Sequence, residues 1–101
     1  MSTFLIKANA DGSVLFSGEL VYSAITPGLW EQSKEILTKA AAAIAINLND
    51  VTQCDSTGVA FIVSWVRLAG KQNKKLSLLN VPAQMRTIIH VSGLEKLLPI
   101  L

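Results

Sequence analysis

The chain has 101 residues, of which 50% are hydrophobic and 16% charged, and a formal net charge of +2. The length predicts one domain, residues 1–101, with a single core, and the composition excludes an intrinsically disordered chain. Cys54 is the one cysteine, so an internal disulfide is excluded. No signal peptide is recognisable, and every apolar run falls short of the ~20 residues of a membrane-spanning helix. We expect a soluble, cytoplasmic protein. Its hydrophobic fraction is larger than a free-living domain of this size needs, which suggests that part of its surface binds a partner.

The first half of the chain predicts a β-hairpin followed by a helix. Residues 3–8 and 13–20 are strand-like and flank an Asp-Gly pair, which is a strong hairpin signal. Residues 24–40 change to a helical period, with Thr26 as a possible N-cap and Pro27 suited to the first helical position. One face of this helix carries Leu29, Ser33, Ile36 and Ala40.

The second half predicts alternating strands and helices, at residues 42–49, 58–73, 75–81 and 82–93. The last stretch, 94–101, fits either a helical turn or an edge strand. The order β-β-α-β-α-β-α contains a right-handed parallel crossover. We therefore expect an α/β fold, with a mixed sheet of four to five strands and helices packed against it.

The stretch Asp55-Ser56-Thr57 lies where a strand meets a helix, a common place for ligands in α/β sheets. Catalysis is disfavoured because Ser56 needs a base, and the single histidine, His90, lies among apolar residues on a short helix. The sequence has no spaced metal-ligand set and no phosphate-binding loop, so we expect no cofactor and no metal. Two interpretations stay open. Asp55 or Ser56 caps the helix while Gly58 allows close packing, or Ser56 is in addition a phosphorylation switch.

The helix that follows has two apolar stripes. Val59, Ile62, Val63, Val66 and Ala69 form a stripe wide enough to cover a sheet. Phe61, Trp65 and Leu68 form a second stripe, which begins one turn from Ser56. Either a neighbouring helix covers this second stripe, or it is an exposed aromatic patch for another protein. The basic run at 70–75 favours a solvated helix end over a nucleic-acid site, because no aromatic residues are interleaved with it.

Several motifs in this order resemble the STAS family (sulfate transporter and anti-sigma factor antagonist). They are the strand ending "INL" at 46–48, the Asp-Ser-x-Gly turn at 55–58, a basic turn into an apolar strand, and the closing "SGLEKLLPI" at 92–100. With "SGEL" at 17–20, the resemblance spans nearly the whole chain. It implies the same α/β architecture that the patterns predict.

Two branches of the family compete. In SpoIIAA-type anti-sigma factor antagonists, a partner serine kinase phosphorylates the serine after the aspartate, which is Ser56 here. In MlaB-like subunits of Gram-negative phospholipid-transport ABC complexes, the domain binds the cytoplasmic ATPase, and through it a membrane permease. The strand end "FSGEL" and the helix carrying Leu29-Trp30-Glu31 resemble the second branch. Val21 stands where both branches often carry an acid, which weakens the case for kinase or nucleotide chemistry.

The resemblance thus implies a non-enzymatic adaptor, peripheral to the inner membrane through its complex, with no nucleic acid and no membrane insertion. Asp55 and Gly58 would shape the turn. The expected partner-binding residues are Ser56, Thr57, Phe61, Trp65 and Leu68. The alternative is an anti-sigma antagonist switched at Ser56.

Overall fold

The computed structural model describes residues 3–101 and begins with the predicted hairpin. Strands β1 (Phe4–Ala8) and β2 (Ser13–Leu20) pair antiparallel. In the turn, the Asp11 carboxylate accepts hydrogen bonds from Ser13 N at 3.0 Å and Ser13 Oγ at 2.6 Å. Gly12 supplies the positive φ of +90° that the turn requires. The hairpin prediction is confirmed.

Helix α1 (Pro27–Lys39) follows a short 3-10 turn, η1 (Tyr22–Ala24). The helix starts where the sequence placed its cap, because Thr26 Oγ1 accepts from Leu29 N at 3.1 Å and Pro27 begins the first turn. Residue 24, which the sequence placed in this helix, instead belongs to the separate 3-10 turn.

The remaining elements are β3 (Ala43–Cys54), α2 (Ser56–Lys71), β4 (Lys75–Leu79) and α3 (Ala83–Val91). The sheet order is β1-β2-β3-β4, and β3 pairs parallel with both β2 and β4. The predicted fold class and element order are confirmed. Strand β3 runs to Cys54, beyond its predicted end at residue 49, because Leu20 of β2 still pairs with Cys54.

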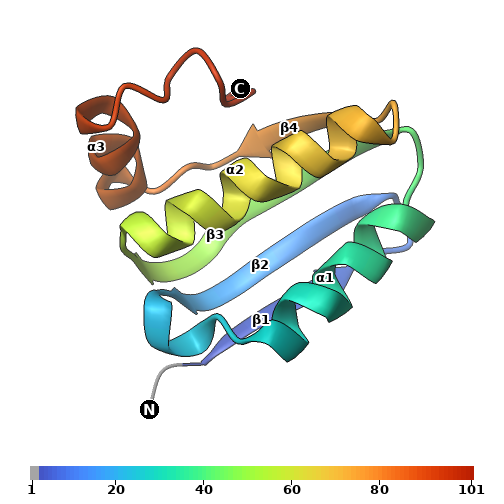
Figure 1. Ribbon diagram of the computed structural model, residues 1–101, viewed down its shortest axis with the longest axis horizontal. Helices are drawn as coiled ribbons and strands as arrows, with labels where there is room; N and C mark the ends of the chain where they lie inside the picture. Colours follow the sequence, from blue (N-terminus) through green and yellow to red (C-terminus); the bar gives the residue numbers. More distant parts are fainter. Residues whose placement is uncertain (1–2) are drawn as a thin grey trace.

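Helices α1 and α2 lie side by side over one face of the sheet, α1 across β1 and β2 and α2 across β3 (Figure 1). Helix α3 packs beside α2. The core between the helices and the sheet is built from alternate strand residues, among them Val14, Phe16, Ile44, Ile46 and Leu78. After α3, Ile100 bridges to Leu78 in parallel, so the final residues add to the edge of β4. The segment therefore forms neither a helix nor a full edge strand: residues 95–97 make a turn, and Ile100 alone makes a β-bridge.

Candidate partner-binding site

The start of α2 is held by one carboxylate. Asp55 is the N-cap of the helix, and its Oδ1 accepts a hydrogen bond from Gly58 N at 2.9 Å. Its Oδ2 accepts from Tyr22 N at 3.0 Å, across 33 positions of sequence. The backbone N of Asp55 also donates to Leu20 O at 3.3 Å. The end of β2, the 3-10 turn and the first turn of α2 are therefore fixed to one another.

Gly58 is the residue that lets α2 approach β2 so closely. A Cβ at this position would collide with Leu20 O and lie 2.8 Å from Leu20 Cγ. Any side chain would therefore push the start of the helix away from the strand, and only glycine fits without that displacement.

Ser56 and Thr57 occupy the first turn of α2, where free N–H groups and the helix dipole favour acceptors and negative charge. Ser56 is exposed and Thr57 is half-buried. Within residues 3–101, the Ser56 hydroxyl makes no hydrogen bond, so it is available to a partner or a modifying enzyme. The histidine considered as its base, His90, is exposed on α3 and contacts Glu95 instead, Nδ1 to Oε1 at 2.7 Å.

Cys54 and the acidic groups offer no evident reaction centre. Burial, with the nearby Asp55 carboxylate, raises the pKa of the Cys54 thiol from 9.0 to about 11. The thiol is therefore protonated and a poor nucleophile at neutral pH. Among the described residues, no group of three His, Cys, Asp or Glu side chains could hold a metal ion.

The prediction of an exposed aromatic patch on α2 is wrong. Trp65 is fully buried and Phe61 is 5% exposed. The indole Nε1 of Trp65 donates to Ser33 Oγ at 2.9 Å, and Ser33 Oγ donates to Trp30 O at 2.8 Å. Helix α1 lies against this flank of α2 and covers it. Of the three predicted stripe residues, Leu68 is half-buried and also packs against the core.

The aromatic rings instead form one cluster between the helices and the hairpin. The Phe16 and Trp65 rings meet edge to face with centroids 5.3 Å apart, and Trp30 and Phe61 do the same at 5.6 Å. Such pairs contribute roughly 0.5–1.5 kcal/mol each beyond the area that they bury. Phe61 and Trp65 therefore stabilise the domain, and Trp65, which is fully buried, is not available to a partner.

A different surface is accessible beside Ser56. A shallow pocket of about 240 Å³ lies between the start of α1 and the first half of α2, lined by Ile25, Trp30, Thr57, Ala60, Phe61 and Ser64. The Tyr22 ring is 75% exposed, and its backbone is bonded to the cap of α2. We call Tyr22, Ser56, Thr57, Ala60 and Ser64, with this pocket, the α2 N-terminal surface.

Tyr22, Ala60 and Ser64 did not emerge from the sequence as site residues. Ser56, Ala60 and Ser64 are spaced four apart, so a helical wheel places them on one ridge, but small residues on an exposed ridge carry no distinctive pattern. Tyr22 follows the strand directly, and only the bond to Asp55 brings it to the start of α2.

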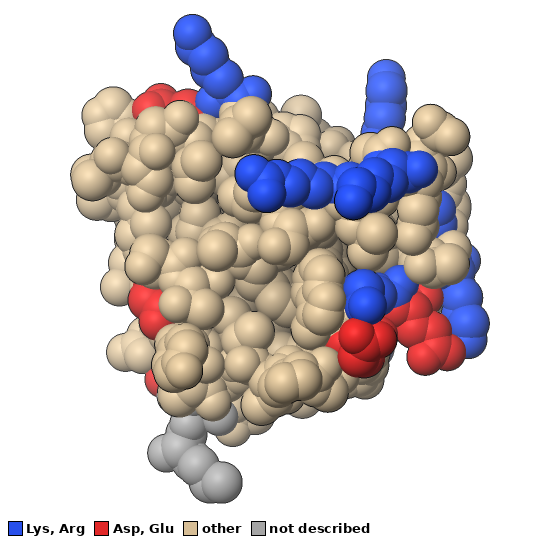
Figure 2. Space-filling view, in the orientation of Figure 1, with Lys and Arg blue, Asp and Glu red and all other residues tan. Residues whose placement is uncertain are grey.

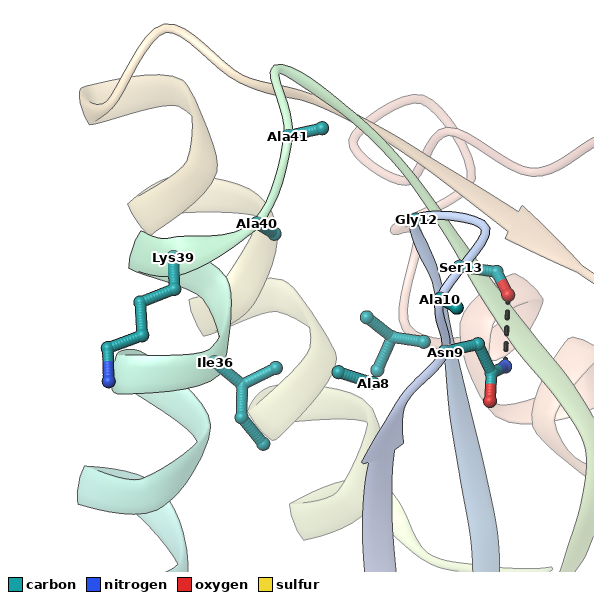
Figure 3. A pocket seen from close by; sticks show the side chains of 10 residues that line it. Ala8, Asn9, Ala10, Gly12, Ser13, Ile36, Lys39, Ala40 and Ala41 are labelled. Carbon is teal, nitrogen blue, oxygen red and sulfur yellow. Dashed lines mark hydrogen bonds between the residues drawn. The ribbon is translucent and has the colours of Figure 1, made fainter.

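A second cavity lies where the β1–β2 hairpin meets the C-terminal end of α1 (Figure 3). It measures about 320 Å³ and is walled largely by alanines with Ile36. Two of its polar side chains are already engaged within the chain, since Asn9 Nδ2 donates to Ser13 Oγ at 3.0 Å and Lys39 Nζ contacts Glu35 Oε1 at 2.8 Å.

No helix in the described part of the chain has the length and hydropathy to cross a bilayer. Residues 7–99 match the family model described as "Mlab, STAS domain". A relative from Haemophilus influenzae, the intermembrane phospholipid transport system binding protein MlaB, is 32% identical over an alignment of 94 residues that covers 89% of each chain.

Solved structures share the fold at lower identity. An anti-sigma factor antagonist from Mycobacterium paratuberculosis superposes with a TM-score of 0.74 at 24% identity, covering 99% of this chain and 85% of that one. The phosphorylated Bacillus cell fate determinant SpoIIAA gives a TM-score of 0.61 at 23% identity, covering 97% of this chain and 90% of that one. The family model and the MlaB relative each cover most of the sequence, so this chain belongs to the STAS family.

Proposed function

We propose that this chain acts as a single STAS unit and a non-enzymatic adaptor of a phospholipid-transport ABC system, binding the cytoplasmic ATPase through the α2 N-terminal surface. The 32% identity with an MlaB protein of an intermembrane phospholipid transport system supports the choice of transport system. The ordered surface beside Ser56 carries the proposal, because it combines an exposed tyrosine, a small apolar pocket and an unpaired hydroxyl. The ATPase brings the adaptor to the inner membrane, and the adaptor supports assembly or activity of the transporter.

The chemistry of the surface suits a protein partner. Tyrosine is frequent among interface residues that dominate binding, and Tyr22 stands out from the surface on a backbone held by Asp55. The pocket beside it, with Trp30 and Phe61 in its wall, can accept an apolar side chain. Ser56 and Thr57 then supply polar contacts around that anchor.

A second candidate is an anti-sigma factor antagonist switched by phosphorylation of Ser56. The exposed Ser56 hydroxyl at a helix N-terminus favours it, because a kinase could reach that oxygen. A phosphate there would stand next to the Asp55 carboxylate and add charge and bulk to the α2 N-terminal surface. The same surface would then be blocked by modification.

The test of the adaptor is affinity purification of the tagged chain from its native cell, with identification of what co-elutes. Wild-type protein should retain an ABC ATPase and a permease. Ala60→Trp places a large ring on the surface, and should reduce ATPase recovery by roughly ten-fold if Ala60 is at the centre of the contact. Ala42→Trp, at an exposed position before β3, is the matched control and should retain the ATPase.

Equal ATPase recovery with Ala60→Trp and Ala42→Trp would contradict the proposed surface. Co-elution of a serine kinase in place of the ATPase, with an intact-mass phosphate adduct that disappears in Ser56→Ala, would establish the switch instead.

A further inference from the structure

Charge is divided unevenly along the chain. Residues 1–55 hold three basic and six acidic side chains, whereas residues 56–101 hold six basic side chains and one acidic one, Glu95. No acid occurs between Ser56 and Leu94. Such asymmetry within one small chain points to an anionic partner for the basic part.

The lysines of α1 and the basic side chains of residues 56–101 differ in how they are used. On α1, Lys34 contacts Glu31 at 2.9 Å and Lys39 contacts Glu35 at 2.8 Å. In the second part, five exposed cations make no ion pair with any described residue: Arg67, Lys71, Lys75, Arg86 and Lys96. Figure 2 shows lysine and arginine gathered over the second half of α2 and β4, while acids and bases are mixed over α1.

An apolar groove of about 410 Å³ runs between the end of α2, strand β4 and the C-terminal segment. Val66, Leu76 and Pro99 are among the side chains that line it, with Leu97, 57% exposed, on one side.

Four of these five cations line this groove or directly adjoin a lining residue in the sequence, and Arg86 does neither. Lys75 lines it directly. Arg67 and Lys71 each follow a lining residue of α2, and Lys96 precedes Leu97. Lys74 also lines the groove, but its Nζ already donates to three backbone carbonyls near the end of α1 at 2.7–2.8 Å.

We propose that this basic groove binds an acidic segment of a protein partner. An apolar side chain of the segment enters the groove, and flanking carboxylates meet Arg67, Lys71, Lys75 and Lys96. The surface lies on the opposite half of α2 from Ser56, so the inference does not depend on the ATPase proposal. A partner could engage both surfaces, or two partners could bind at once.

The shape and composition of the groove distinguish this partner from other anionic ones. Nucleic acid is disfavoured because no aromatic side chain lines the groove to stack on a base. Membrane binding requires apolar side chains that project beyond the cations into the lipid. Here Leu76, in the groove, is only 7% exposed, which suits an inserted side chain better than a flat bilayer.

The groove is tested with the whole chain and a fluorescent synthetic peptide of alternating glutamate and leucine, followed by anisotropy. The wild-type chain should bind the peptide, less tightly as salt rises, because exposed charge pairs are screened. The double variant Arg67→Glu/Lys71→Glu should weaken binding by roughly ten-fold or more. Lys7→Glu/Arg86→Glu makes the same change in net charge at exposed sites away from the groove, and should leave binding nearly unchanged.

Circular dichroism of each variant verifies the fold, and a peptide with serine in place of leucine tests the apolar anchor and should lose binding. The inference is overturned if the wild-type chain does not bind the glutamate–leucine peptide, or if both double variants weaken binding equally. It is also overturned if the chain sediments with phosphatidylglycerol vesicles while showing no affinity for the peptide.

Discussion

Ser33 joins the two helices through one buried hydroxyl, and its removal has a calculable cost. Ser33 is fully buried and accepts the indole N–H of Trp65 at 2.9 Å. Alanine at this position leaves that N–H buried without an acceptor. An unsatisfied buried donor costs about 1–3 kcal/mol, so Ser33→Ala should lower the free energy of unfolding by about 2 kcal/mol.

Urea titration followed by far-UV circular dichroism measures this change, and the m-value should stay constant because the area exposed on unfolding is nearly the same. A double-mutant cycle with Trp65→Phe isolates the hydrogen bond. Phenylalanine has no N–H to leave unsatisfied, so Ser33→Ala should cost at least ~1 kcal/mol less in that background.

Ser64→Ala is the control, because Ser64 also bonds to a helix carbonyl, Ala60 O at 3.0 Å, but on the exposed side of α2. It should change stability by no more than ~0.5 kcal/mol. The reasoning is refuted if Ser33→Ala costs no more than Ser64→Ala, or costs the same whether residue 65 is tryptophan or phenylalanine.

Two further predictions concern the other buried or shared polar groups. Lys74→Met removes three hydrogen bonds to carbonyls near the end of α1 and should lower the free energy of unfolding in urea by about 1–3 kcal/mol. The control Lys71→Met, at an exposed position, should lower it by less than ~0.5 kcal/mol. Equal losses would show that Lys74 does not hold α1 in place. The raised pKa of Cys54 means that the unfolded thiol ionises before the folded one, so this thiol's contribution to stability falls as pH rises from 9.0 to about 11. Cys54→Ala should lack that part of the decline, and identical pH profiles for the two proteins would contradict the assignment.

Local signals in the sequence located most elements, and long-range pairing decided the rest. The Asp-Gly turn and the Thr26-Pro27 helix start depend on neighbouring residues alone, and both occur as predicted. The end of β3 could not be predicted in this way. Residues 49–53 are mostly polar and resemble a loop, yet their pairing with β2 keeps them in the sheet.

The prediction of an exposed aromatic site on α2 was wrong for a related reason. A helical wheel shows two apolar stripes on α2, but it does not show which one α1 will cover. A clue was present in Ser33, a hydroxyl on the otherwise apolar face of α1, because a buried serine and a buried tryptophan can satisfy each other. The ridge of Ser56, Ala60 and Ser64 could be identified as a candidate binding surface only after the structure showed that Phe61 and Trp65 are buried.

The carboxylate of Asp55 gives the molecule a preformed face for association. Tyr22 and Ser56 come from separate segments. The backbone of Tyr22 is hydrogen-bonded to the Asp55 carboxylate, and Ser56 directly follows Asp55 in the helix turn that the same carboxylate caps. The surface is therefore preorganised, and binding a partner would not require a loop of this chain to become ordered. Little conformational entropy of this chain would be lost on binding. Mutations on such a face should change affinity mainly through the rate of dissociation, and the heat-capacity change on binding should reflect the surface buried at the interface without an added contribution from folding.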